Sequence, residues 1–226
     1  MCPRRAFTLT ELLVLILLFG LLLILLIPAF VRARQGSRID ANNTRLRGIH
    51  LGFVQTAQAS QQTFAGLGGD IGYLGDIDSR LASTRMWLLL KNNLLTPEWI
   101  ISPLDTGKIE ASIALTTANF SYALLDISPD APNRVNEWAA TANRHGAVVS
   151  DRSKAIVPPG DSLTTTSLHV TTTTIDSRDW RGGVAWNDNH VTFEFDGIMP
   201  TRYGTLNTVE DDIFVDIKGD GLMCYN

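Results

Sequence analysis

Cysteine is scarce in this sequence: Cys2 and Cys224 stand at its two ends. Exported proteins commonly stabilise their folds with disulfide bonds between paired cysteines. If the first residues are removed on export, Cys2 goes with them and no intrachain disulfide is left. We therefore expect the fold to be held together by its core alone.

Motifs of enzyme active sites and nucleotide sites are also missing. The sequence has no Gly-x-Ser-x-Gly, His-Glu-x-x-His, P-loop or Cys-x-x-Cys motif. Its four histidines, His50, His145, His169 and His190, are scattered without metal-ligand spacing. His190 follows Asp188 closely, but a histidine in a turn is more often structural or exposed than catalytic. The sequence therefore predicts a protein that is not an enzyme.

Basic residues are few after residue 48. This part of the chain has 12 basic and 21 acidic residues, a net charge of about −9. The first 48 residues, in contrast, hold seven arginines and two acids. A nucleic-acid-binding surface needs basic side chains to contact phosphates. We therefore expect no nucleic-acid partner.

What the sequence does have is a long apolar run near its N-terminus. Residues 12–31 carry no charge, and as a helix they would span about 30 Å, the thickness of a bilayer hydrocarbon core. Arg4 and Arg5 precede the run and are expected to stay cytoplasmic, with the bulk of the chain exported. This pattern predicts a single pass through a membrane.

Two ordinary export signals fit this region incompletely. A cleavable secretory signal would leave a mature chain starting near Arg34, but the run is longer than the usual signal core of about 7–15 residues. Residues 4–7, Arg-Arg-Ala-Phe, match the centre of a twin-arginine signal. The carboxylate of Glu11 is costly inside an apolar run and usually marks a function, so it disfavours both readings.

Residues 4–13 read Arg-Arg-Ala-Phe-Thr-Leu-Thr-Glu-Leu-Leu. This segment resembles the leader of type IV prepilins and type II secretion pseudopilins, in which a basic leader ends in a small residue, Phe follows, and the fifth mature residue is Glu. The resemblance implies cleavage by prepilin peptidase after Ala6, N-methylation of Phe7, and an assembly role for Glu11. Position 6 is usually Gly in that family, so Ala6 is a departure.

The resemblance extends to Pro28, which stands where the family often places a helix-bending proline. Gly20 also weakens a helix locally, and we expect a bend at both positions, although membrane helices tolerate such residues without one. In a filament the apolar helices would bundle in a dry core, where Glu11 needs a cationic partner. Its natural partner is the N-terminal amine of a neighbouring subunit.

The helical pattern continues beyond the apolar run. An amphipathic stripe recurs at helical spacing through residues 32–63, formed by Ile39, Leu46, Ile49, Phe53 and Ala57. Five arginines between Arg32 and Arg47 oppose the positive-inside rule, and we expect them to contact lipid head groups or acidic neighbours.

The remaining chain, residues 64–226, is predicted to form an exported head. We expect a helix over residues 79–93, strands over 113–116, 120–125 and 147–149, and a Thr-rich strand or loop over 163–175. Residues 183–195 predict a hairpin around Asn187-Asp188-Asn189. It resembles the C-terminal hairpin of a large pilin-like family, matching at Asp188, His190 and Val191. Asn189 replaces a Gly there, and Trp180 stands near the place of a His.

Acidic residues gather near the C-terminus, at Glu210, Asp211, Asp212, Asp216 and Asp220. Calcium takes six to eight oxygen ligands, and major pseudopilins carry a calcium site late in the head. This makes Asp211, Asp212, Asp216 and Asp220 candidate calcium ligands. The competing interpretation, which we favour, is an exposed strand over residues 213–217 with solvated flanks.

Together these features predict an α+β, pilin-like fold: a leader (1–6), a filament-core helix (7–31), its amphipathic continuation (32–63) and a head with an antiparallel sheet (64–226). The expected function is a structural subunit of a type IV pilus or type II secretion pseudopilus. Its expected partners are copies of itself or related pilins, prepilin peptidase, the assembly machinery and the bilayer. The alternatives are a non-polymerising single-pass protein with an exported binding head, and a secreted soluble protein.

Overall fold

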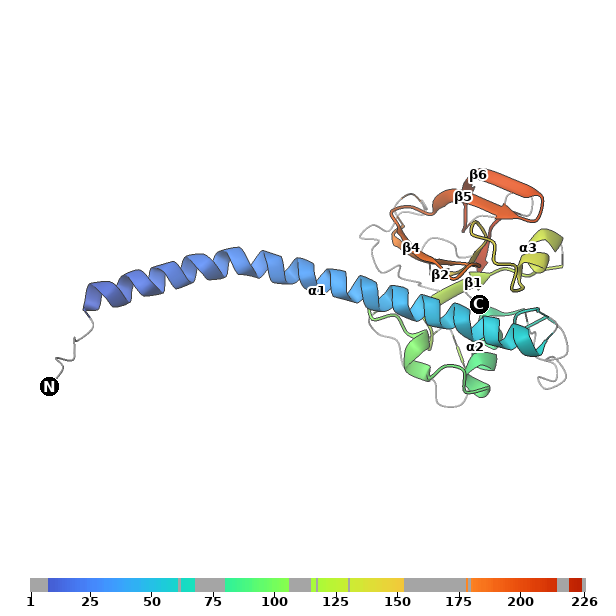
Figure 1. The fold of residues 1–226 in the computed structure, drawn as a ribbon, viewed down its shortest axis with the longest axis horizontal. Helices are drawn as coiled ribbons and strands as arrows, with labels where there is room; N and C mark the ends of the chain where they lie inside the picture. The colour runs from blue at the N-terminus through green and yellow to red at the C-terminus, as the bar shows by residue number, and fades with distance from the viewer. Residues whose placement is uncertain are drawn as a thin grey trace. The chain divides into compact units, whose positions relative to one another are not determined.

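The computed structural model describes residues 8–60, 62–67, 80–105, 115–116, 118–129, 131–152, 178, 180–214 and 220–224. The chain forms two compact units, Met1–Asp40 and Ala41–Asn226. One helix, α1 (Leu9–Ala59), contributes its first part to the first unit and its second part to the second (Figure 1).

The second part of α1 has the one-sided burial that its sequence predicts. From Asn42 onward a single face is buried, including Leu46, Ile49, Phe53 and Ala57 of the predicted stripe. The helix ends at Ala59 rather than near Thr63, and the chain leaves it through Gln62, whose φ is 71°. A residue in this left-handed conformation commonly terminates a helix.

An antiparallel five-stranded sheet forms the centre of the second unit. Its strands lie in the order β4-β3-β2-β1-β7. They are β1 (Tyr122–Leu125), β2 (Ala147–Asp151), β3 (Gly182–Trp186), β4 (Val191–Glu194) and β7 (Met223–Cys224). The α+β class with a long apolar N-terminal helix and an antiparallel sheet is thereby confirmed. Cys224, in β7, forms no disulfide with any residue that the structure describes.

The predicted hairpin is confirmed as β3 and β4, with Ala185 opposite Val191. Its turn contains Asn189 at a φ of 68°. Asparagine tolerates this left-handed conformation better than most residues other than glycine. This explains how Asn189 can occupy the turn of this hairpin.

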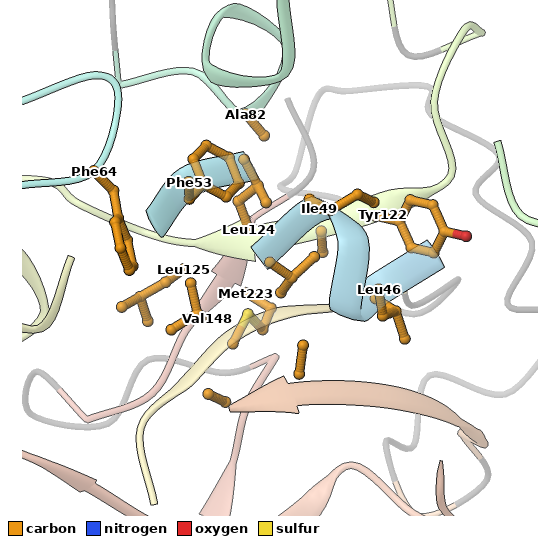
Figure 2. Close-up of a cluster of buried hydrophobic side chains, with 14 of the residues drawn as sticks. Leu46, Ile49, Phe53, Phe64, Ala82, Tyr122, Leu124, Leu125, Val148 and Met223 are labelled. Carbon is orange, nitrogen blue, oxygen red and sulfur yellow. The ribbon is translucent and has the colours of Figure 1, made fainter. Parts of the chain in front are cut away.

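Side chains from α1 and the sheet share one hydrophobic core. Figure 2 shows Leu46, Ile49 and Phe53 of α1 among side chains of β1, β2 and β7. The Phe53 ring lies 4.8 Å from that of Trp138, centroid to centroid, in an edge-on arrangement. Edge-on aromatic pairs add to the stability gained from burial, so this cluster fixes the end of α1 on the sheet.

Further elements complete the second unit. They are α2 (Ala82–Lys91), the 3-10 helix η2 (Pro97–Ile100), α3 (Pro132–Glu137) and a two-stranded sheet of β5 (Ile198–Tyr203) and β6 (Leu206–Asp212). The guanidinium of Arg85 in α2 donates to the Leu125 carbonyl at 2.8 Å and lies 4.4 Å from the centre of the Trp138 ring. This buried cation is therefore both hydrogen-bonded and stacked.

The strand expectations hold in part. Strands over 120–125 and 147–149 are confirmed as β1 and β2, and the helix over 79–93 as α2. The prediction of a strand over 113–116 is wrong for the described residues 115–116, which are not in a strand. The N–H of Thr116 donates to Asn119 Oδ1 at 3.0 Å within a turn. Residues 113–114 and the Thr-rich stretch 163–175 lie outside the described residues.

The expected exposed strand over 213–217 is also wrong over its described part. Ile213 and Phe214 form a turn after β6 and are 0% and 2% exposed. The Phe214 ring packs against Trp180, with centroids 5.0 Å apart. Burial of apolar surface explains this arrangement, since both residues bring large apolar side chains to the core.

Gly183 marks the closest approach of β3 to α1. A Cβ built on it would overlap the Leu46 side chain and lie 2.9 Å from Asn43 Oδ1. We predict that Gly183→Ala lowers the free energy of unfolding by about 1–3 kcal/mol through overpacking. The measurement is urea unfolding of the full chain in detergent, followed by tryptophan fluorescence. Gly36→Ala is the control, because a Cβ there meets nothing within 4 Å; equal midpoints for the two variants would contradict the prediction.

Candidate functional site

The first part of α1 presents apolar side chains all round. Exposure of the large hydrophobic residues between Leu9 and Val31 ranges from 38% at Leu26 to 79% at Leu9. Helix α1 is long and apolar enough to cross a membrane. A helix that is apolar on every side is normally buried in a protein core or in lipid, so this surface is the strongest candidate interaction site of the chain.

Thr8 and Glu11 cap the N-terminal end of α1 through hydrogen bonds in both directions. The Thr8 N–H donates to Glu11 Oε2 at 2.9 Å, and the Glu11 N–H donates to Thr8 Oγ1 at 3.3 Å. The Thr8 hydroxyl also donates to Oε2, at 2.7 Å. This is a capping box, which satisfies two of the free N–H groups at a helix start.

Sequence reasoning assigned Glu11 to assembly and missed this local role, although Thr-x-x-Glu before an apolar run is its signature. The carboxylate is exposed, and Oε1 accepts no hydrogen bond from the part of the chain that the structure describes. Capping therefore occupies one carboxylate oxygen and leaves the other facing outward. Ala6 and Phe7, the predicted cleavage and methylation residues, lie outside the described residues.

Gly20 and Pro28 both lie within α1, which continues through them. Nothing lies within 4 Å of a Cβ built on Gly20, so no neighbour within this chain requires a glycine there. Pro28 has no N–H to donate to the carbonyl one turn earlier. Both positions weaken the helix, and the bend that we expect at them remains a prediction.

Among the described candidate calcium ligands, Asp211 and Asp220 lie near one another, since the charge of Asp220 acts on Asp211. Asp211 Oδ2 accepts hydrogen bonds from the Thr201 hydroxyl and from the Gly221 N–H, the latter at 2.9 Å. Asp212 Oδ1 instead accepts from the N–H of Phe214 at 3.1 Å. Among the described residues no group of three or more His, Cys, Asp or Glu side chains is placed to hold a metal ion, and Asp216 lies outside them.

Asp211 and Asp220 are nonetheless unusual because both are buried, at 1% and 3% exposure. Burial, together with the negative charge of Asp220, raises the pKa of Asp211 to about 7. A carboxyl that holds its proton near neutral pH must release it before it can bind a cation. Occupation by calcium would therefore depend on pH.

The described histidines do not form a catalytic or metal-binding group. His190 Nδ1 contacts Asp188 Oδ1 in the hairpin turn, and its ring stacks on Trp186 with centroids 5.6 Å apart. His50 is buried under the same turn, with Nδ1 3.1 Å from Asn189 Oδ1, and burial lowers its pKa. The contacts of His190 stay within the hairpin, whereas His50 links the hairpin turn to α1.

A buried polar network between α1 and the sheet was not anticipated. The Asn42 amide donates to Asp151 Oδ2 at 2.8 Å, and its oxygen accepts from the hydroxyls of Ser102 at 2.6 Å and Tyr122 at 3.0 Å. The Gly183 N–H donates to the same carboxylate oxygen at 2.7 Å. The signal was present, since Asn42 interrupts the apolar stripe at helical spacing and a buried amide requires partners.

The carboxyl of Asp151 gives this network a dependence on pH. Burial raises its pKa from 3.8 to about 7, although hydrogen bonds from Gly183 and Asn42 oppose the shift. Between these two values the folded chain holds a proton that the unfolded chain has released. Its contribution to stability is therefore fully present below about pH 4 and is lost as the pH rises to about 7.

We predict that Asp151→Asn flattens this decline and raises the free energy of unfolding at pH 8 by roughly 2–4 kcal/mol relative to the parent chain. Asparagine keeps an oxygen for Asn42 and Gly183 but does not ionise. The measurement is urea unfolding across this pH range. Asp211 is the second carboxyl with a pKa of about 7, so Asp211→Asn should remove a separate part of the decline in stability with pH. If stability declined with pH in Asp151→Asn as it does in the parent chain, the role assigned to Asp151 would be contradicted.

No protein-family model matches the chain, and comparison with curated proteins and with solved structures gives no match.

Proposed function

We propose that this chain is a structural subunit of a type IV pilus or a type II secretion pseudopilus. Its precursor is cut after Ala6 by prepilin peptidase, and the mature chain assembles through the N-terminal part of α1. The observation that carries the proposal is the carboxylate of Glu11, exposed at the capped start of α1 and followed directly by the exposed apolar residues 12–31.

The physical argument concerns the cost of that charge. A carboxylate in lipid or in a dry helix bundle is expensive unless it is paired. The capping box supplies hydrogen bonds but no positive charge, and Glu11 Oε1 accepts no bond from the described part of the chain. The methylated amine of Phe7 in an adjacent subunit would supply the charge and set the axial register between subunits.

The proposal also fixes where the protein acts. The subunit would first reside in the inner membrane with its N-terminus in the cytoplasm and its head exported, and would then be drawn into the filament by the assembly machinery. The apolar surface from Leu9 to Val31 would exchange lipid for the same surface of its neighbours. The head would remain outside the filament core, held together without a disulfide.

The first prediction is the N-terminus of the native protein. Membrane-extracted chains should begin at N-methyl-Phe7, because processing removes the leader and its two arginines. The measurement is intact mass combined with N-terminal sequencing. A chain that begins at Met1 would favour a non-polymerising membrane anchor, and one that begins near Arg34 would favour a secreted soluble protein; either outcome would overturn the proposal.

The second prediction separates the charge of Glu11 from its capping role. Glu11→Gln keeps an oxygen for the Thr8 N–H but removes the charge, so membrane insertion should persist while assembly falls at least tenfold, equivalent to losing about 1.4 kcal/mol or more per contact. Thr8→Ala keeps the charge and removes the hydroxyl, so filaments should still form. Sheared filaments are quantified against membrane-bound subunits. Equal assembly of Glu11→Gln and the parent chain would refute the charge pairing.

A further inference from the structure

Three arginines follow the apolar part of α1 directly: Arg32, Arg34 and Arg38, here called the arginine collar. All three side chains are exposed, and they make no hydrogen bond or ion pair with the residues that the structure describes. The residues between them are small or uncharged, namely Ala33 and residues 35–37. Nothing in the described chain therefore neutralises these charges.

We infer that the arginine collar binds the phosphate groups of anionic phospholipids in the leaflet nearest the C-terminal end of the apolar segment. The inference rests on the membrane insertion proposed above, and it concerns the chain while it resides in the membrane, before any assembly. Guanidinium groups suit this ligand because they donate paired hydrogen bonds to phosphate oxygens and keep their charge at any physiological pH.

The depth of the collar fits the head-group layer. With a rise of about 1.5 Å per residue, Arg32 lies about 1.5 Å beyond Val31 along the helix, Arg34 about 4.5 Å and Arg38 about 10 Å. The interfacial layer of one leaflet is roughly 5–8 Å thick beyond the hydrocarbon core. Long arginine side chains reach along the helix to find the interface, so all three guanidinium groups have access to it.

The angular arrangement favours lipid over a protein neighbour. At about 100° per residue, Arg34 and Arg38 share one face of the helix, whereas Arg32 points roughly 160° away from Arg34. An acidic partner protein would approach from one side and leave part of the collar unpaired. Lipid head groups surround the helix on all sides and can pair with each arginine.

The test uses the full chain reconstituted in vesicles of phosphatidylcholine with a minor fraction of phosphatidylglycerol. The protein is extracted with its adjacent lipids in styrene–maleic acid particles, and both lipids are counted by mass spectrometry. We expect phosphatidylglycerol to be enriched around the chain. The variant with Arg32→Gln, Arg34→Gln and Arg38→Gln should lose this enrichment by about fivefold or more, since each basic residue contributes a factor of about five near an anionic surface.

The matched control carries Arg144→Gln, Arg181→Gln and Arg202→Gln. It removes the same total charge from exposed head residues and should keep the enrichment. Flotation of the vesicles reports insertion separately, so a failure of the proposed membrane residence is distinguished from a failure of lipid recognition.

Three outcomes would overturn the inference. Equal enrichment in the collar variant and the parent chain would exclude the collar as the lipid site. Loss of enrichment on adding inorganic phosphate, but not chloride of equal ionic strength, would indicate a free-phosphate site instead. A collar variant with unchanged lipid enrichment but impaired filament assembly would assign the arginines to an acidic protein neighbour.

Discussion

The carboxyl of Asp151 lies fully buried in the central sheet, where it accepts hydrogen bonds from Asn42 of α1 and from the backbone of β3. The side-chain oxygen of Asn42 accepts hydrogen bonds from the hydroxyl groups of Ser102 and Tyr122. The side-chain amide of Asn42 thus links α1 to strands β1 and β2 and to the segment after η2. Because unpaired polar groups are costly in a core, this network favours the observed register of α1 on the sheet, in which Leu46 and Phe53 are buried.

The long helix changes character at that point. From Leu9 to Val31 its large hydrophobic side chains are exposed, and from Asn42 onward one face of the helix, including Leu46, Ile49 and Phe53, is buried in a core. Among the described residues, side chains of this chain cover the second part of α1 and leave the large hydrophobic residues of the first part exposed. The residues Ala41–Asn226 form a compact unit of their own, in which Cys224 makes no disulfide with any described residue.

The sequence predicted features that rest on a local period or a short motif. The apolar run, the stripe through Leu46 and Phe53 and the hairpin around Asn189 were all expected. The sequence did not reveal the position of Asn42 opposite Asp151, because residues far apart in the chain meet there. Phe214 was misread as part of an exposed strand for a related reason: local alternation does not show that Trp180 covers it. The capping role of Glu11 could be predicted from Thr8 three residues earlier, whereas an assembly role involves other chains.

The way that α1 enters the head has a mechanical consequence. A pulling force carried along the backbone of α1 reaches the head through the stretch that holds Asn42, Leu46, Ile49 and Phe53, all buried. Because a helix is stiff, sliding it out would strain these contacts together rather than one after another. A pull along the axis of α1 is therefore shared among these buried contacts.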